Sequence, residues 1–108
     1  MIMQYTLSRL TVKEEQLREA KRAIAELIAA VREHEPRTLY LVFREKRKST
    51  FFALVSFEND AAWRSHAQSR HVDRFAKKLL PLCEGKPVFL DLSQFASSRK
   101  QWMLEQTF

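Results

Sequence analysis

The order of hydrophobic and polar positions predicts the elements of the first half of the chain. Residues 2–9 alternate apolar and polar side chains, which is typical of a strand. From residue 17 to residue 31, apolar side chains recur every three or four positions, which predicts one long amphipathic helix. Thr11 and Glu14 precede this helix at the spacing of a capping box. Pro36 ends it, because the residue before a proline is disfavoured in helical geometry.

Two runs rich in β-branched and aromatic residues follow. Residues 38–43 (TLYLVF) and 51–57 (FFALVSF) are separated by the charged residues 44–48 (REKRK), and this pattern predicts a hairpin. Both runs are apolar on both of their faces. Since the helices of so small a chain can cover one face of a sheet, we expect a second copy of the same sheet to cover the other. The pattern therefore predicts a homodimer that associates through the sheet face.

The second half predicts two short helices and a last strand. Asn59 is a candidate cap for a helix that runs through His66, and Ser69 is a candidate cap for a second helix that stops at Pro81. Residues 88–92 (VFLDL) predict a strand. The order β-α-β-β-α-β predicts an α+β, ferredoxin-like fold with an antiparallel sheet. We expect one domain over residues 1–95 and a C-terminal tail over residues 96–108.

Composition and charge limit the possible functions. The chain has 108 residues, 45% hydrophobic and 30% charged, as is typical of one globular domain. Its net charge of +6 allows nucleic-acid binding, but the charges are interspersed, which favours a basic surface without such a partner. We recognise no signal peptide and no apolar run that could span a membrane, so we expect a cytoplasmic protein. The only glycine, Gly85, excludes a glycine-rich phosphate loop, and the only cysteine, Cys83, excludes an internal disulfide.

One stretch of the second half carries four candidate site residues: Trp63, His66, His71 and Phe75. On one continuous helix the two histidines, five positions apart, would lie on different faces, whereas zinc-binding pairs prefer a spacing of four. No third ligand stands at a suitable spacing, so we expect no metal site. From spacing alone, the histidines are more simply explained as surface or hydrogen-bonded core residues, and Phe75 as part of the apolar stripe. Cys83 is expected to be a buried, unreactive thiol.

The strand at residues 52–57 offers a rival interpretation. It partly resembles the first signature of RNA-recognition-motif domains, which share the predicted order of elements and stack bases on strand aromatics. Three positions depart from that signature: Thr50 and Phe51 stand where a basic residue and a glycine belong, and Leu54 occupies a stacking position. Burial of Phe52 and Phe57 in sheet packing is the simpler interpretation. The basic link 44–48 could hold phosphates, but a solvated turn explains it equally well.

Over residues 2–93 the chain resembles the antibiotic biosynthesis monooxygenase family, whose members are dimeric ferredoxin-like α/β barrels. Residues 35–38 (EPRT) stand where the family carries Glu-Pro-Gly-Thr, with Arg37 in the glycine position. Residues 57–62 (FENDAA) then lead to a histidine, a second histidine and an aromatic residue, as they do in the family. Residues 85–87 (GKP) precede the last strand in the expected place.

The resemblance implies an activity and a role for each candidate. Quinol and polyketide monooxygenases of this family need neither metal nor flavin, because an ionised phenol or enol itself reduces O2. The resemblance therefore implies no cofactor, and a small aromatic or quinol-like substrate that reacts with O2. His66 would be the catalytic acid/base or hydrogen-bonding residue. Trp63 and His71 would bind the substrate, and Phe75 would form apolar wall.

Other members of the family leave two alternatives open. Haem-degrading relatives carry Asn, Trp and His at the positions of Ser8, His66 and Ala76 in this chain, so the resemblance disfavours haem degradation. Fold-level likeness alone does not choose a reaction. The alternative from another class is therefore a non-catalytic module that binds a small ligand or RNA on the same fold.

Overall fold

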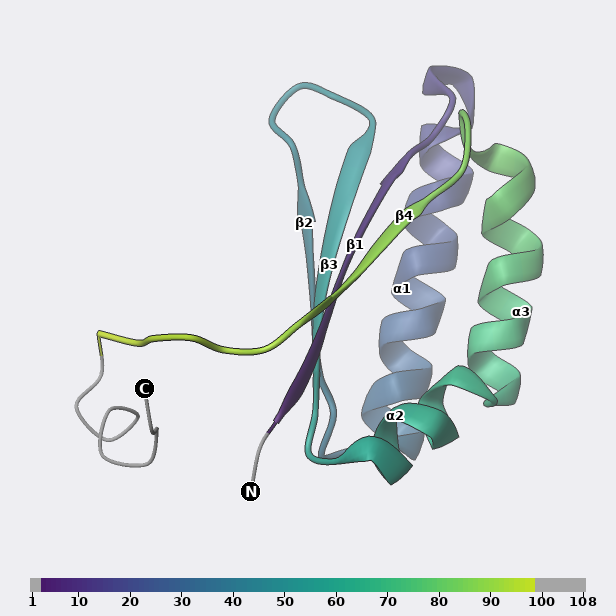
Figure 1. Ribbon diagram of the computed structural model, residues 1–108. Coiled ribbons are helices and arrows are strands. Elements are labelled where there is room, and N and C mark those ends of the chain that lie inside the picture. Colours follow the sequence, from purple (N-terminus) through teal and green to yellow (C-terminus); the bar gives the residue numbers. More distant parts are fainter. Residues whose placement is uncertain (1–2, 99–108) are drawn as a thin grey trace.

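The computed structural model describes residues 3–98, which form a four-stranded antiparallel sheet with helices on one of its faces (Figure 1). The elements are β1 (Gln4–Thr11), η1 (Glu14–Gln16), α1 (Leu17–His34), β2 (Leu39–Arg44), β3 (Thr50–Phe57), α2 (Asp60–Ala67), α3 (Arg70–Leu79), η2 (Leu80–Leu82) and β4 (Val88–Leu92), where η1 and η2 are single 3-10 turns. The strand order is β2-β3-β1-β4. The predicted ferredoxin-like α+β fold is confirmed.

The register of the sheet separates two faces. Ser8 pairs with Ala53, and both lie on the face that α1 and α3 cover, where Ala53 is buried. The next pair, Leu7 with Leu54, points to the opposite face because successive side chains of a strand alternate. The core forms between the sheet and the helices, around Val12 and Phe57, which are buried almost completely.

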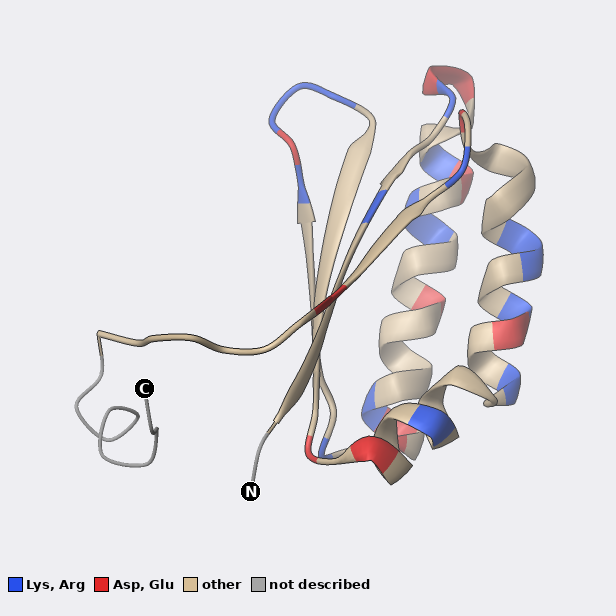
Figure 2. Ribbon diagram, in the orientation of Figure 1, with Lys and Arg blue, Asp and Glu red and all other residues tan. Residues whose placement is uncertain are grey.

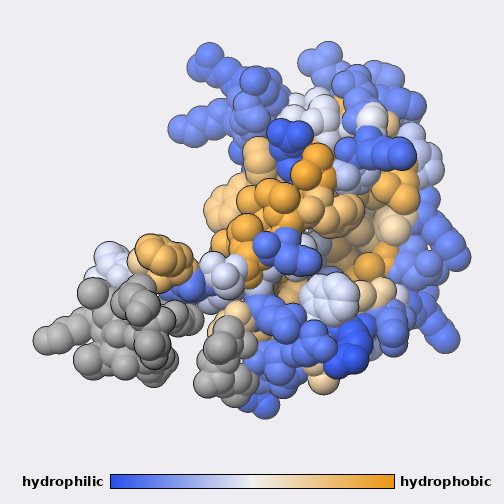
Figure 3. Space-filling view, in the orientation of Figure 1, coloured by the Kyte–Doolittle hydropathy of each residue, from blue (hydrophilic) through white to orange (hydrophobic). Residues whose placement is uncertain are grey.

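The face of the sheet away from the helices is open and apolar. Its side chains on the two edge strands are 38–55% exposed: Leu39, Leu41, Phe43, Val88, Leu90 and Leu92. Apolar side chains gather over the strands in Figure 3, whereas Lys and Arg concentrate at the hairpin tip and on the outer sides of the helices in Figure 2. The outward face of β2 is apolar, as the pattern of residues 38–43 predicts, and the homodimer stays a prediction.

The predicted capping box at the start of α1 is wrong. Thr11 is the last residue of β1, and its hydroxyl group hydrogen-bonds with that of Thr50 at 2.8 Å. The chain stays extended because the next residue, Val12, is fully buried, donates its N–H to the Ser49 carbonyl at 2.9 Å and forms a bridge with Cys83. The turn η1 then leads into α1 without a side-chain cap.

Two further expectations concern the second half of the chain. Cys83 is buried, its thiol donates to the Leu79 carbonyl at 3.4 Å, and burial raises its pKa, so the expected buried thiol is confirmed. Residues 99–108 of the predicted tail lie outside the described residues, and the domain boundary at residue 95 stays a prediction. Within residues 3–98, no helix combines the length and the apolar character needed to cross a membrane.

Candidate functional site

A cavity of about 450 Å³ lies between the sheet and the helices. Its volume is in the range of small-molecule sites, and its wall is mainly apolar. Among the candidate residues, Trp63, His66 and Phe75 line the cavity, and His71 does not. Tyr40, which sequence reasoning did not single out, also lines it. The alternation of β2 could have indicated Tyr40, because this residue and Val42 face the helices while Leu41 faces outward.

Two capped helices position the histidines. The Asn59 side chain accepts from the Ala62 N–H at 2.8 Å and starts α2, as predicted. The Ser69 side chain accepts from the Val72 N–H at 3.3 Å and starts α3, also as predicted. The Ser69 hydroxyl also donates to the His66 carbonyl at 2.7 Å, which ties the end of α2 to the start of α3. The two short helices are therefore separate, and their histidines converge.

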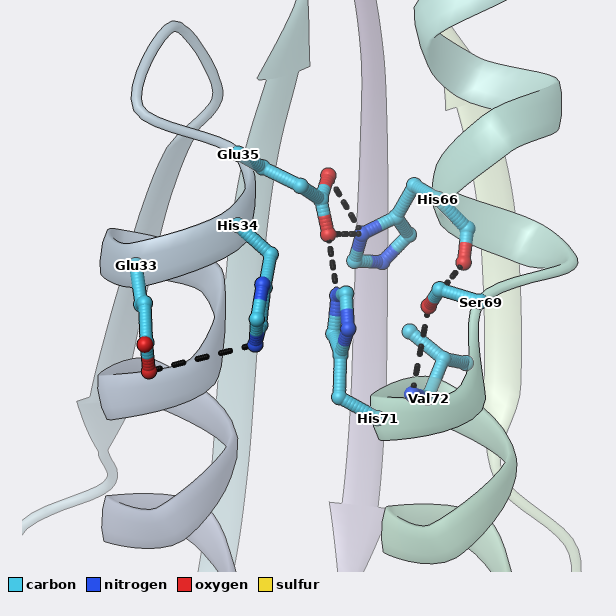
Figure 4. A network of polar contacts seen from close by, with 7 residues as sticks. All are labelled: Glu33, His34, Glu35, His66, Ser69, His71 and Val72. Atoms are coloured by element: carbon cyan, nitrogen blue, oxygen red, sulfur yellow. Dashed lines mark hydrogen bonds and ion pairs between the residues drawn. The ribbon is translucent and has the colours of Figure 1, made fainter.

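Glu35 completes this arrangement from the end of α1. Pro36 prevents the helix from continuing, and the carboxylate of Glu35 lies between the two histidines (Figure 4). His66 Nδ1 lies 2.9 Å and 2.8 Å from its two oxygens, and His71 Nε2 contacts one of the same oxygens. The three side chains are only 12–15% exposed. We call Glu35, His66 and His71 the imidazole–carboxylate cluster.

Aromatic side chains surround the cluster. The His66 ring lies 5.1 Å from the ring of Phe57 and 5.8 Å from that of Tyr40, measured between centroids. The His71 ring stacks on His34 at 5.7 Å, and His34 itself is largely exposed. The cluster therefore connects the cavity wall at His66 with the protein surface at His34.

Burial and hydrogen bonding act on the ionisable groups of the site. Burial raises the pKa of the Glu35 carboxyl, but the hydrogen bonds and charge interactions with His71 and His66 together outweigh this effect, so the net pKa is lowered and Glu35 is ionised at neutral pH. Burial and the nearby Glu35 charge raise the pKa of Tyr40 to about 12. Tyr40 therefore presents a neutral hydroxyl group at neutral pH.

The cluster corrects the argument made above against a metal site. The helix is interrupted between the two histidines, and Glu35 supplies a third ligand, so that the three donor atoms lie within 4.8 Å of one another. Two histidines and a carboxylate can hold zinc or iron. In this structure Glu35 lies within hydrogen-bonding distance of both rings. The geometry is that of a hydrogen-bonded cluster.

Residues 3–78 match the antibiotic biosynthesis monooxygenase family. Among solved structures, the chain is similar to a candidate antibiotic biosynthesis monooxygenase from Caulobacter crescentus, with 22% identity, a TM-score of 0.81, and coverage of 88% of this chain and 92% of that one. A candidate family member from Bacteroides thetaiotaomicron shares 23% identity with a TM-score of 0.80, over 92% of this chain and 95% of that one. A conserved protein from Methanosarcina mazei shares 16% identity with a TM-score of 0.80, over 88% and 95%. No protein of curated function matches the chain significantly.

Proposed function

The chain belongs to the antibiotic biosynthesis monooxygenase family, and we propose that it oxidises a quinol-like or polycyclic aromatic substrate with O2, without metal or flavin. One observation supports this most directly: His66 lines a mainly apolar cavity while its Nδ1 is bound to the Glu35 carboxylate. A carboxylate only accepts hydrogen bonds, so Nδ1 carries the proton. The other nitrogen, Nε2, is then free to accept a proton from a ligand in the cavity.

The proposed reaction begins with proton transfer from a phenolic or enolic O–H group to His66 Nε2. The electron pair of that bond stays on the substrate oxygen, and the resulting anion is electron-rich enough to reduce O2. In an enol substrate, the neighbouring C–H carbon gains one oxygen atom and becomes a carbonyl. Its hydrogen and the proton held by His66 leave with the second oxygen atom as water, which restores the neutral histidine. An apolar, water-poor cavity suits such a step, because it strengthens the electrostatic interactions within the site and protects reactive intermediates.

The candidate residues divide between two places. Trp63 and Phe75 line the cavity, where they would contact the aromatic rings of the substrate. His71 lies behind His66, so we propose that it acts on Glu35 instead of on the substrate. Ser8 and Ala76, at two of the positions that haem-degrading relatives use, also line the cavity but offer no imidazole for iron. We therefore do not propose haem degradation.

Oxygen uptake by the purified protein tests the proposed function. The chelator-treated protein would be offered hydroquinones and polycyclic phenols, and His66→Ala and His34→Ala would be run beside it. We expect uptake above the autoxidation rate, lowered about 10²-fold or more in His66→Ala because general acid–base catalysis contributes that much. His34→Ala should behave as wild type, because His34 is exposed and lies outside the cavity wall. No uptake with any substrate would contradict the proposal.

The second candidate function is a non-catalytic binding module. The burial of Phe57 supports a small molecule over RNA as its ligand. The RNA interpretation needed Phe52 and Phe57 for base stacking. Phe57 is only 1% exposed and packs against His66, as the simpler interpretation predicted, whereas Phe52 is half-buried. A small aromatic ligand in the cavity would contact Trp63 and quench its fluorescence. Quenching that is absent in Trp63→Phe, together with no oxygen uptake, would favour this module over the enzyme.

We also propose that the protein is a homodimer whose protomers meet through the open face of the sheet. Contiguous exposed apolar patches of this kind mark interaction surfaces. The patch lies on the regular surface of the sheet, over both edge strands, which suits self-association about a two-fold axis. The cavity lies on the opposite side of the same sheet, so dimer formation leaves the helices around it in place.

A further inference from the structure

Glu35 is a buried carboxylate whose partners are two imidazole rings. Its side chain is 12% exposed, and in the described part of the chain its ion pairs are with His66 and His71, not with a lysine or arginine. The nearest arginine in sequence, Arg37, instead pairs with Glu58 at 3.0 Å. A buried charge is costly unless it is paired and hydrogen-bonded, so the cluster depends on both histidines.

The orientation of the His66 ring follows from this contact. Nδ1 lies almost equally far from the two carboxylate oxygens, at 2.9 Å and 2.8 Å. This symmetric contact holds the proton on Nδ1 and directs the opposite edge of the ring away from Glu35. His66 lines the cavity and Glu35 does not, so the contact selects the tautomer in which Nε2 is the base.

We propose that Glu35 is the positioning residue for His66 and that His71 controls how strongly Glu35 acts. This inference rests on the proposed function of the site. When His66 takes the substrate proton on Nε2, it becomes an imidazolium ion, and the Glu35 carboxylate stabilises the new charge. His71 shares the same carboxylate oxygen, so protonation of His71 weakens this stabilisation, and the two histidines compete for one negative charge.

The groups that face the cluster from the neighbouring elements are few. His34 of α1 stacks on His71, and Tyr40 of β2 lies beside His66. The hydroxyl group of Tyr40 stays neutral below about pH 12, so it does not titrate in the working range. His34 is the one further histidine in the sequence, and its ion pair is with the exposed Glu33, at 3.8 Å. It therefore provides a matched control.

The pH dependence of kcat/KM tests the proposal through opposite shifts in two variants. In Glu35→Gln we expect kcat/KM to fall about 10- to 100-fold, and its acid limb to move to lower pH, because the charge that His66 takes from the substrate loses its carboxylate. In His71→Gln the acid limb should move to higher pH, since Gln still donates to Glu35 but no longer competes for its charge. His34→Gln should leave the profile unchanged.

A purely structural role for Glu35 would lower the rate without moving the acid limb, and that result would overturn the proposal. The ring ¹⁵N signals of the histidines give a test that needs no substrate. We expect His66 in the wild type to carry its proton on Nδ1, and Glu35→Gln to show a mixture of tautomers. A bare Nδ1, or one equivalent of metal released by a chelator, would overturn the proposal even if oxygen uptake is observed. If the tautomers are as expected but no oxygen uptake is observed, the proposed role of Glu35 is supported and only the proposed function is contradicted.

Discussion

At the scale of single residues, Glu35 links the stability of the protein to pH. Its folded-state pKa lies below the ordinary value of 4.5 because the hydrogen bonds and charge interactions with His71 and His66 together outweigh the effect of burial. The ionised carboxylate therefore stabilises the fold at pH values above 4.5. This contribution is lost as the pH falls below 4.5 and passes through the lower pKa of the folded state.

Glu35→Gln should lower the free energy of unfolding at pH 7 by about 1–2 kcal/mol, because hydrogen bonds to a charged group are lost and Gln replaces them incompletely. Urea unfolding at pH 7 and pH 3 would measure the difference, which should shrink at the lower pH. Glu33→Gln is the control, since Glu33 is exposed and contacts His34 only at 3.8 Å. An equal loss for Glu35→Gln at both pH values would contradict this prediction.

The sequence predicts which residues line the cavity better than it predicts the contacts that determine their chemistry. Trp63, His66 and Phe75 were candidates, and all three line the cavity. Glu35 was noted only as part of the segment EPRT, because a carboxylate 31 residues from His66 carries no periodic signal that connects the two. The contact depends on where α1 ends relative to α2, which is a property of the tertiary structure.

At the scale of elements, the break between α2 and α3 determines the site. An uninterrupted helix would have placed the two histidines on different faces, as the spacing argument assumed. Asn59 and Ser69 were predicted as caps, and both are, because a capping side chain and its N–H partner are local in sequence. The capping box at Thr11 failed because burial of Val12, from the far side of the core, keeps the chain extended there. A capping motif in the sequence therefore predicts the start of a helix correctly where no distant contact competes with it.

Ser69→Ala should therefore affect both stability and the site. The variant loses the cap of α3 and the hydrogen bond to the His66 carbonyl, so we expect a loss of about 1 kcal/mol in the free energy of unfolding. Urea unfolding followed by circular dichroism would measure it. Ser65→Ala, at an exposed position within α2, should stay within about 0.5 kcal/mol of wild type. Equal stability of the two variants would show that the cap is not needed.

At the scale of the whole molecule, the strand pattern indicated the sheet and predicted that a second copy of it covers one face. Sequence alone placed apolar residues on both faces of β2 and β3, and the structure shows that one of these faces is covered by helices. Which surface covers the other face depends on shape, and no periodicity encodes shape. The sequence pattern did not predict the cavity either, because its wall combines side chains from all four strands and three helices.

The open sheet face leads to a prediction about oligomeric state. Leu41 lies on β2 within this face and is 38% exposed in one protomer, so a dimer through the sheet would bury it. We expect light scattering coupled to size exclusion to give twice the chain mass at micromolar concentration. Leu41→Glu should shift the protein toward the monomer, because a charge buried without a partner is costly. Ala25→Glu introduces the same charge at an exposed position of α1, away from the sheet, and should leave the dimer intact. A wild-type monomer at this concentration, or a dimer that persists in Leu41→Glu and dissociates in Ala25→Glu, would rule out association through the sheet.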